Sequence, residues 1–398
     1  MRIVVIASLD ASLLSFRGHL LSAMDKLGHQ VFSCAPENKP ATVTALKHLG
    51  VEYRQIRLQR SGLNILADAG SLWRLTSALK HLAPDLVFCY TIKPVIYGSL
   101  AASRAGVKNI CSMITGLGVA FVGEGWRARL LNRLAKSLYR AALRKNRVVF
   151  FQNTDDQRLF QELRLLHQPE QAVTVNGSGV DLDYYYACPP VVAGPVFLLV
   201  ARLLKEKGIR EFVAAAARLK KKHAAARFVI VGGVESSLSA IAPEQIRFWS
   251  EKGLIEYHDW TVDVRPLFAA CSVYVLPSYR EGTPRTVLEA MAMSRPIVTT
   301  NTPGCRETIC FTENGAAGAA RLTSEGVLRG LNGFLVPVKN VELLETAMEQ
   351  FILEPELITR MGQNSRRLAE RRFDVKAVNA VMLKSMGLWK PNGDPRLG

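Results

Sequence analysis

In Val273-Tyr-Val-Leu-Pro-Ser-Tyr-Arg-Glu-Gly-Thr-Pro-Arg-Thr-Val-Leu-Glu-Ala-Met-Ala292, a short apolar run leads through a polar loop into an amphipathic segment. The apolar run ends at Pro277, and Thr283 as an N-cap before Pro284 at the first helical position predicts the start of a helix. A buried strand that leads through a loop into a helix is the repeating unit of parallel α/β sheets. This stretch therefore predicts an α/β protein.

The same unit recurs along the chain, because further short runs rich in Val, Ile and Phe alternate with segments of helical period. Such continuous apolar runs predict doubly wound sheets that are covered by helices on both faces. These runs are Ile3–Ala7, Val31–Cys34, Leu86–Tyr90, Ile110–Ile114, Val148–Gln152, Phe197–Ala201, Phe228–Val231 and Ile297–Thr300.

This rhythm breaks at the segment Cys188-Pro-Pro-Val-Val-Ala-Gly-Pro195, which we interpret as a linker. We expect an N-terminal domain over 1–190 and a C-terminal domain over 191–371, with the carboxyl ends of both sheets around one cleft. A helix over 372–390 is expected to return to the N-terminal domain, and 391–398 to be disordered. The aperiodic, Ala/Gly-rich segment 316–329 is interpreted as a surface loop or insertion.

The composition narrows the class of protein. The 398 residues are 48% hydrophobic, enough for two cores, and no stretch provides the roughly 20 apolar residues of a membrane-spanning helix. The start lacks the features of a signal peptide, which predicts a cytoplasmic location. The seven scattered cysteines include no C-x-x-C pair and are interpreted as reduced core residues. The net charge of +17 predicts attraction to phosphates, nucleic acid or anionic lipid head groups.

Two glutamates frame the predicted start of the helix in the opening stretch. Glu281 precedes the helix and Glu289 lies two turns into it, so both can face one pocket. A helix N-terminus attracts phosphate, and carboxylates accept hydrogen bonds from vicinal sugar hydroxyls. On spacing alone, a solvated loop glutamate and a surface helix glutamate explain the pattern equally well.

Taken with other motifs, this stretch closely resembles the signature of glycosyltransferase family 4, in which two glutamates separated by seven residues follow a strand ending in Pro-Ser. Ala201-Arg202-Leu-Leu-Lys-Glu-Lys207-Gly208 resembles the phosphate-binding loop of that family. Val229-Ile-Val-Gly-Gly233 resembles its next strand and turn, and Tyr257-His-Asp-Trp260 its nucleobase wall. The resemblance implies a GT-B fold, with two Rossmann-like doubly wound domains facing a central cleft and the donor bound to the C-terminal domain.

The resemblance also implies roles for individual residues. Arg202 and Lys207 would bind the diphosphate of a UDP-sugar without a metal ion, and no other cofactor is implied. Glu281 would contact the transferred sugar and stabilise its oxocarbenium-like transition state, whereas Glu289 would accept hydrogen bonds from the ribose. Further implied donor-binding residues are Gly233, His258, Gly282, Thr283, Thr286, Val287 and Leu288.

The resemblance implies transfer with retention at the anomeric carbon. A front-face displacement is favoured, in which the departing phosphate oxygen takes the proton of the acceptor. A covalent mechanism with two carboxylates is the less favoured variant.

The N-terminal half resembles bacterial transferases that build surface polysaccharides and undecaprenyl-diphosphate-linked oligosaccharides, including N-acetylgalactosaminyltransferases. The acceptor would accordingly be a polyprenyl-diphosphate-linked saccharide, with acceptor or cleft residues at Phe16, Arg17 and Gly18 and at Thr115, Gly116 and Gly118. Many members of the family have two glycines where this chain has Phe16-Arg17-Gly18, and a His near Thr115 or Gly116. This chain lacks that His, which would otherwise recognise the primary hydroxyl of the sugar.

A basic helix is predicted from Trp126 to Arg147, which contain eight basic residues and no acidic one. At about 100° per residue, its cations form one stripe, opposite Leu130, Leu131, Leu134, Leu138 and Ala141. We interpret the stripe as a peripheral docking patch for the cytoplasmic face of the membrane, with the leucines in the core and with Trp126 and Tyr139 at the interface. A solvated basic face is the alternative. The stripe consists of Arg129, Arg133, Lys136, Arg140, Arg144 and Arg147.

The sequence also allows three other functions to be considered for this chain, two of which its motifs disfavour. A nucleic-acid-binding protein is disfavoured because the stripe has little aromatic interleaving and no nucleic-acid-binding motif occurs. A sugar-nucleotide epimerase of the same fold is disfavoured by the two glutamates and the Arg202/Lys207 loop. A GT-B glycosyltransferase with a soluble acceptor remains open.

Overall fold

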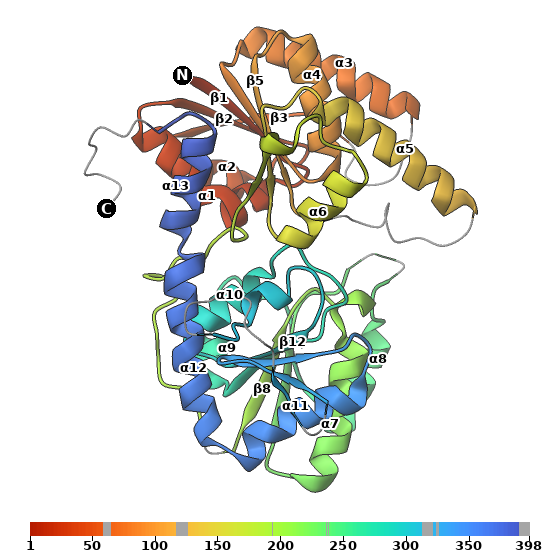
Figure 1. Ribbon diagram of the computed structural model, residues 1–398, viewed down its shortest axis with the longest axis vertical. Coiled ribbons are helices and arrows are strands. Elements are labelled where there is room, and N and C mark those ends of the chain that lie inside the picture. Colours follow the sequence, from red (N-terminus) through yellow and green to blue (C-terminus); the bar gives the residue numbers. More distant parts are fainter. Residues whose placement is uncertain are drawn as a thin grey trace. The chain divides into compact units, whose positions relative to one another are not determined.

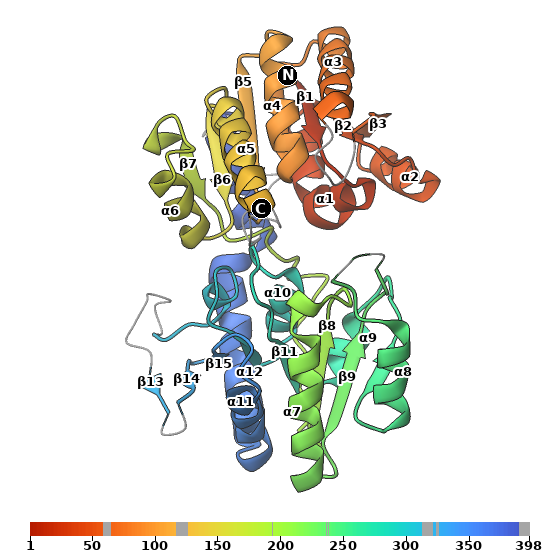
Figure 2. The ribbon, with the colours of Figure 1, turned by 90° about the vertical axis from the view of Figure 1, so that its right-hand side faces the viewer.

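The computed structural model describes residues 1–58, 65–116, 126–192, 194–235, 237, 239–312, 321–323 and 326–389. These residues form two compact units, one from the described residues of 1–178 together with 375–389 and the other from those of 179–374. Each unit holds one mainly parallel sheet with helices on both faces (Figures 1 and 2). The predicted α/β architecture is therefore confirmed.

The sheet of the first unit has seven parallel strands, and its central strands are buried on both faces. Their order is β3 (Val51–Gln55), β2 (Gln30–Ala35), β1 (Arg2–Ile6), β4 (Leu86–Tyr90), β5 (Asn109–Ile114), β6 (Val148–Phe151) and β7 (Ala172–Thr174). The helices are α1 (Asp10–Lys26), α2 (Pro40–His48), α3 (Ile65–Leu82), α4 (Ser99–Arg104), α5 (Trp126–Leu143), α6 (Thr154–Glu162) and α13 (Val375–Ser385), with a π-helical turn η1 at Pro94–Gly98 before α4.

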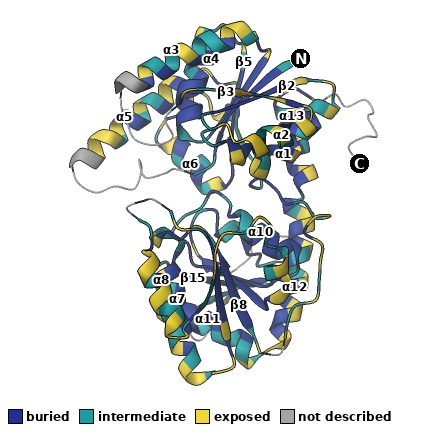
Figure 3. Ribbon diagram, turned by 180° about the vertical axis from the view of Figure 1, so that it is seen from behind, coloured by how far each residue is buried: buried dark blue, intermediate teal, exposed yellow. Residues whose placement is uncertain are grey.

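Strand β1 shows how this sheet divides its core. Successive side chains of a strand point to opposite faces. Ile3 and Val5 therefore pack in the cluster completed by α1 and α13, whereas Val4 and Ile6 pack in the cluster completed by α3, α4 and α5. An apolar run of this kind specifies a strand with helices on both sides, as Figure 3 shows by its dark blue central strands.

The second unit repeats this layout with an antiparallel edge. Its sheet order is β10 (Glu256–His258), β9 (Arg227–Val231), β8 (Val196–Val200), β11 (Val273–Leu276), β12 (Ile297–Thr300), β15 (Gly333–Val336), β14 (Leu328–Arg329) and β13 (Arg321–Leu322). The helices are α7 (Ile209–Lys222), α8 (Pro243–Glu251), α9 (Arg265–Ala270), α10 (Arg285–Ala292), α11 (Val341–Leu353) and α12 (Glu356–Leu368).

The segment interpreted as a linker, Cys188–Pro195, belongs to the second unit. The fully buried Arg295 fixes its start, because the guanidinium donates to the backbone carbonyl of Cys188 at 3.0 Å and to that of Phe268 at 2.6 Å. The chain instead passes between the units at Ser178–Gly179 and again at Asp374–Val375. There Val180 N–H donates to the carbonyl of Phe373 at 2.7 Å, so the two crossing segments lie side by side.

Within the segment interpreted as a surface loop or insertion, residues 321–322 and 328–329 pair as β13 and β14 in an antiparallel edge of the sheet. The bounds predicted for the last helix, 372–390, were wrong, because α13 spans Val375–Ser385. Residues 391–398, expected to be disordered, lie outside the described residues. Among the described helices, none combines the length and apolar character needed to cross a bilayer.

Candidate functional site

Three loops of the second unit follow the carboxyl ends of β8, β11 and β12, neighbouring strands of the sheet. Their backbones approach so closely that only glycine fits at two positions. Gly208 has φ +71°, and a Cβ there would lie 2.1 Å from the carbonyl oxygen of Pro277. Gly304 has φ +78°, and a Cβ there would lie 2.3 Å from the carbonyl oxygen of Gly282. The loops therefore form one closely packed assembly at the sheet edge where α/β proteins bind ligands.

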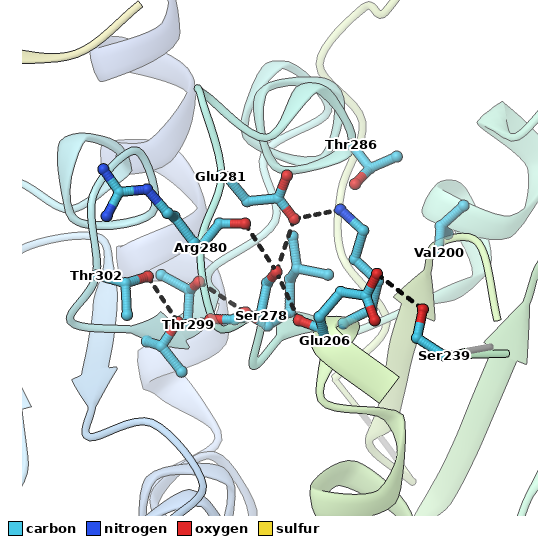
Figure 4. A network of polar contacts seen from close by, with 12 residues as sticks. Val200, Glu206, Ser239, Ser278, Arg280, Glu281, Thr286, Thr299 and Thr302 are labelled. Carbon is cyan, nitrogen blue, oxygen red and sulfur yellow. Dashed lines mark hydrogen bonds and ion pairs between the residues drawn. The ribbon is translucent and has the colours of Figure 1, made fainter. Parts of the chain in front are cut away.

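Lys207 and Glu281 meet within this assembly. Figure 4 shows Glu281 beside Ser278 at this place. The Nζ of Lys207 forms an ion pair with Oε1 of Glu281, and the hydroxyl of Ser278 lies 2.7 Å from the same oxygen. The two charged side chains are 17% and 15% exposed, so both can still be reached from solvent. The structure thus brings together two of the three predicted catalytic residues, one from the loop after β8 and one from the loop after β11.

Arg202, the third predicted catalytic residue, pairs with a different carboxylate. Its guanidinium is 3.8 Å from Glu235 in the loop after β9, and the side chain is 57% exposed. An exposed ion pair of this length contributes little stability, so the arginine can change partner at low cost.

Glu289 is held inside the second unit by two donors. Its Oε1 accepts from the hydroxyl of Tyr185 at 2.9 Å and from Nε of Arg285 at 2.8 Å, and only 5% of the residue is exposed. Burial raises the pKa of Glu289, while Arg285 and the hydrogen bond from Tyr185 act to lower the pKa. The carboxylate is thus fixed in position by partners that favour its charged form.

Tyr185 was not predicted as a site residue. It follows a turn in which Oδ1 of Asp181 accepts from the N–H groups of Asp183 and Tyr184, both at 3.0 Å. The motif Asp181-Leu-Asp-Tyr-Tyr185 signals such a turn. Its partner Glu289 lies 104 residues away, and no local pattern specifies that contact.

The helix after the Glu281 loop begins later than predicted. Pro284 is the N-cap residue of α10 and Arg285 the first helical residue, so the assignment of Thr283 as N-cap was wrong. Val287 and Leu288 are fully buried, and their N–H groups donate to the carbonyl of Pro284. Their side chains belong to the core of the second unit.

The other predicted donor-binding residues lie near the same sheet edge. Thr286 Oγ1 is 2.6 Å from the hydroxyl of Tyr274, and His258 is exposed at the end of β10. Gly233 follows β9, and a Cβ there would be 3.3 Å from Cβ of Trp260, which is itself 70% exposed. The predicted nucleobase wall is therefore open to solvent at Trp260.

The predicted acceptor residues belong to the first unit. Phe16 is 44% exposed on α1, whereas Arg17 is buried with its guanidinium 5.4 Å from the centre of the Tyr90 ring. Gly18 is also buried. Thr115 and Gly116 follow β5, and Gly116 has φ +140°, in the region that favours glycine. Gly118 lies outside the described residues.

The basic segment differs from its prediction in three ways. First, α5 ends at Leu143, so Arg144 and Arg147 follow the helix, and Arg147 donates to the carbonyl of Ser385 at 2.8 Å. Second, Tyr139 is buried against Phe160 rather than placed at an interface.

Third, Leu130, Leu131, Leu134 and Ala141 are exposed, whereas Ala135, Tyr139, Ala142 and Leu143 face the core. The prediction that the leucines pack in the core was therefore wrong for Leu130, Leu131 and Leu134, whereas Leu138 is partly buried against the core of the first unit. In the basic stripe, Arg129, Arg133 and Arg140 are exposed and Lys136 is partly exposed. The side chain of Trp126 lies outside the described residues.

Comparisons with protein families divide the chain in the same way as its fold. Residues 16–177 match the glycosyl transferase 4-like domain, and residues 191–368 match the glycosyl transferases group 1.

Curated relatives cover most of the chain. N,N'-diacetylbacillosaminyl-diphospho-undecaprenol alpha-1,3-N-acetylgalactosaminyltransferase of Campylobacter jejuni is 28% identical over 79% of this chain and 84% of its own. UDP-Gal:alpha-D-GlcNAc-diphosphoundecaprenol alpha-1,3-galactosyltransferase of Escherichia coli is 25% identical over 80% and 79%.

Solved structures share the fold at low sequence identity. HepE of Anabaena, crystallised with UDP and glucose, aligns over 98% of this chain and 100% of its own, with a TM-score of 0.75 and 16% identity. Sucrose-phosphate synthase of Thermosynechococcus elongatus aligns over 96% and 98%, with a TM-score of 0.73 and 17% identity.

Proposed function

Because the chain belongs to the GT-B glycosyltransferases, with a glycosyl transferase 4-like domain before a group 1 domain, we propose that it transfers a sugar from a UDP-sugar to a lipid-linked saccharide with retention. The sugar is a hexose or an N-acetylhexosamine. The reaction serves the assembly of a bacterial surface polysaccharide or glycan.

The observation that carries this proposal is the meeting of Lys207 and Glu281 at the carboxyl edge of the second sheet. A diphosphate leaving group needs positive charge beside it, and a sugar that develops oxocarbenium character needs negative charge. An ammonium group has three donors, so Lys207 can keep Glu281 while it binds a phosphate oxygen. Arg202, whose present ion pair is exposed, supplies a second cation in place of a metal ion.

Retention is proposed to follow from a front-face displacement. The bond between the anomeric carbon and the phosphate oxygen breaks as the acceptor oxygen bonds to the same carbon from the same side. The acceptor proton passes to the departing phosphate oxygen, so the step needs no separate protein base. Glu281 stabilises the cationic sugar, and Glu289 accepts from the ribose hydroxyls of the donor.

The proposed acceptor is a polyprenyl-diphosphate-linked saccharide, bound by residues of the first unit that include Phe16 and Gly116, whereas the buried Arg17 supports this region from within. Two relatives support this class, since the names of both specify an undecaprenol-diphosphate-linked acceptor. The name of the Escherichia coli relative also specifies a UDP-sugar donor.

Such an acceptor lies in a membrane, so we place the enzyme peripherally at the cytoplasmic face. The exposed cations of α5 support this placement, because each basic residue near an anionic surface adds roughly 1 kcal/mol of attraction.

A donor panel tests the proposed function. Purified protein is incubated with UDP- and GDP-sugars, with and without extracted lipid-linked saccharide, and nucleotide release is measured. We expect release of UDP from one UDP-sugar, accelerated by the lipid fraction. Epimerisation of a UDP-sugar without transfer would contradict the proposal, and acceleration by a soluble saccharide alone would replace the lipid acceptor with a soluble one.

A further inference from the structure

Helix α5 has two parts that differ in their surroundings. From Ala135 onward, every third or fourth residue is buried against the first unit, and Tyr139 packs edge-on against Phe160 at 5.4 Å between ring centres. From Arg129 to Leu134 no side chain is buried. This earlier part extends away from the sheet and is largely yellow, the colour of exposed residues, in Figure 3.

The exposed leucines are large for a surface that faces water. Leu130 is 61% exposed, Leu131 42% and Leu134 36%, all within five residues. Single exposed leucines are ordinary, but a cluster on one helix marks an interaction surface. This cluster lies on the part of α5 that the described residues of the first unit leave uncovered.

The exposed leucines and arginines lie in neighbouring stripes. At about 100° per residue, Ala135, Tyr139 and Ala142 define the core side of the helix. The exposed side carries one stripe of cations and, directly beside it, one stripe of leucines. The cations are Arg129, Arg133 and Arg140, and the leucines are Leu130 and Leu134, with Leu131 at the border toward the core.

We propose that the part of α5 from Arg129 to Leu134 lies in the surface of an anionic bilayer, with its leucines between the acyl chains and its arginines at the lipid head groups. This inference rests on the proposed membrane attachment. It adds a hydrophobic contribution to an attachment that was first proposed as electrostatic. A basic helix with an apolar stripe matches an interfacial helix. The occupant is an anionic lipid rather than a protein, because Trp126–Arg147 contains eight cations and no carboxylate.

The difference between the two modes of attachment appears in their response to salt. At about 1 M salt the Debye length is about 3 Å, so attraction between arginines and head groups is screened. Insertion of leucines is not weakened by salt. A protein attached by its arginines alone should dissociate from the vesicles at about 1 M salt. A protein that also inserts leucines should stay bound at that concentration.

The test is flotation of the purified full chain with vesicles of phosphatidylglycerol and phosphatidylethanolamine at low salt and at about 1 M NaCl, where screening is strong. We expect the unmodified protein to float in both conditions. Leu130→Ser with Leu134→Ser should float at low salt but lose at least about tenfold in binding at high salt. The matched control is Leu353→Ser, which removes a leucine that is 63% exposed on α11, and should float as the unmodified protein does.

Release of the unmodified protein by high salt, or equal binding by the leucine variant, would overturn the insertion. A thermal unfolding midpoint for the leucine variant within a few degrees of the unmodified protein shows that it is folded. Vesicle flotation requires no catalysis. If no UDP-sugar of the donor panel gives UDP release while the protein still floats at high salt, the proposed reaction is wrong, but the inference that α5 inserts into the membrane is supported.

Discussion

Replacement of Lys207 with alanine is expected to lower kcat by roughly 10²–10³-fold, the effect of removing one preorganised donor from a developing anion. Lys207 is the cation that contacts Glu281, so its loss removes charge from the proposed diphosphate site and also the partner that orients this carboxylate. The measurement is the initial rate of UDP release at saturating donor.

Lys205→Ala is the matched control. Lys205 lies in the same 3-10 turn, is exposed and should leave kcat within about twofold. The hydroxyl of Ser278 stays beside Glu281 in the Lys207 variant, so stability should fall by only about 1 kcal/mol. Full activity of Lys207→Ala would refute the proposed role in binding the diphosphate.

Replacement of Glu289 with alanine is expected to weaken UDP binding by roughly 10- to 100-fold. A hydrogen bond to a charged group contributes about 1.5–3 kcal/mol, and one such bond to a ribose hydroxyl accounts for this range. The measurement is the dissociation constant of UDP by calorimetry. Unchanged affinity in a folded variant would remove Glu289 from the ribose site.

Tyr185→Phe tests whether the orientation of the Glu289 carboxylate matters, because this variant keeps the carboxylate and removes one of the hydrogen bonds that hold it. The variant keeps the ring and loses the hydroxyl that donates to Glu289, so UDP affinity should fall about two- to tenfold. That hydrogen bond lowers the pKa of Glu289, so its removal raises the pKa. A carboxylate that binds ribose in its charged form then loses UDP at a higher pH than in the unmodified protein. Tyr184→Phe, at an exposed neighbour, should leave both the affinity and the pH profile unchanged.

The central strands could be predicted closely from the sequence. Leu86–Tyr90 and Ile297–Thr300 were predicted with the bounds that the structure has, because a strand covered on both faces must be apolar throughout. The edge strand Val51–Gln55 was missed. Four of its five side chains are exposed or only partly buried, so its sequence carries no apolar run.

For the donor site, the sequence predicted which residues lie near one edge of the sheet but not the contacts between them. Parallel strands bring their carboxyl ends together, which predicts that Lys207 and Glu281 are neighbours. Neither their ion pair nor the bond from Tyr185 to Glu289 follows from that rule. Both depend on packing between segments that are 74 and 104 residues apart in the sequence.

Helix α5 shows why a period is not enough to assign a buried face. Its sequence holds two apolar stripes, one of leucines and one that includes Ala135, Tyr139 and Ala142. Because leucine side chains are larger, the sequence predicted that the leucine stripe packs against the core. The structure packs the second, because small residues let the helix approach η1 and α4 closely while Tyr139 fills the space against Phe160.

The proposed function is tested most directly by the anomeric configuration of the product. The purified enzyme is given the UDP-sugar selected by the donor panel, in its α-linked form, together with polyprenyl-diphosphate-linked saccharide. The new linkage is then assigned by NMR. We expect one sugar to be added to the lipid-linked saccharide in an α-linkage, with UDP released in equal amount. A β-linked product, or UDP release without any glycosylated lipid, would contradict the account.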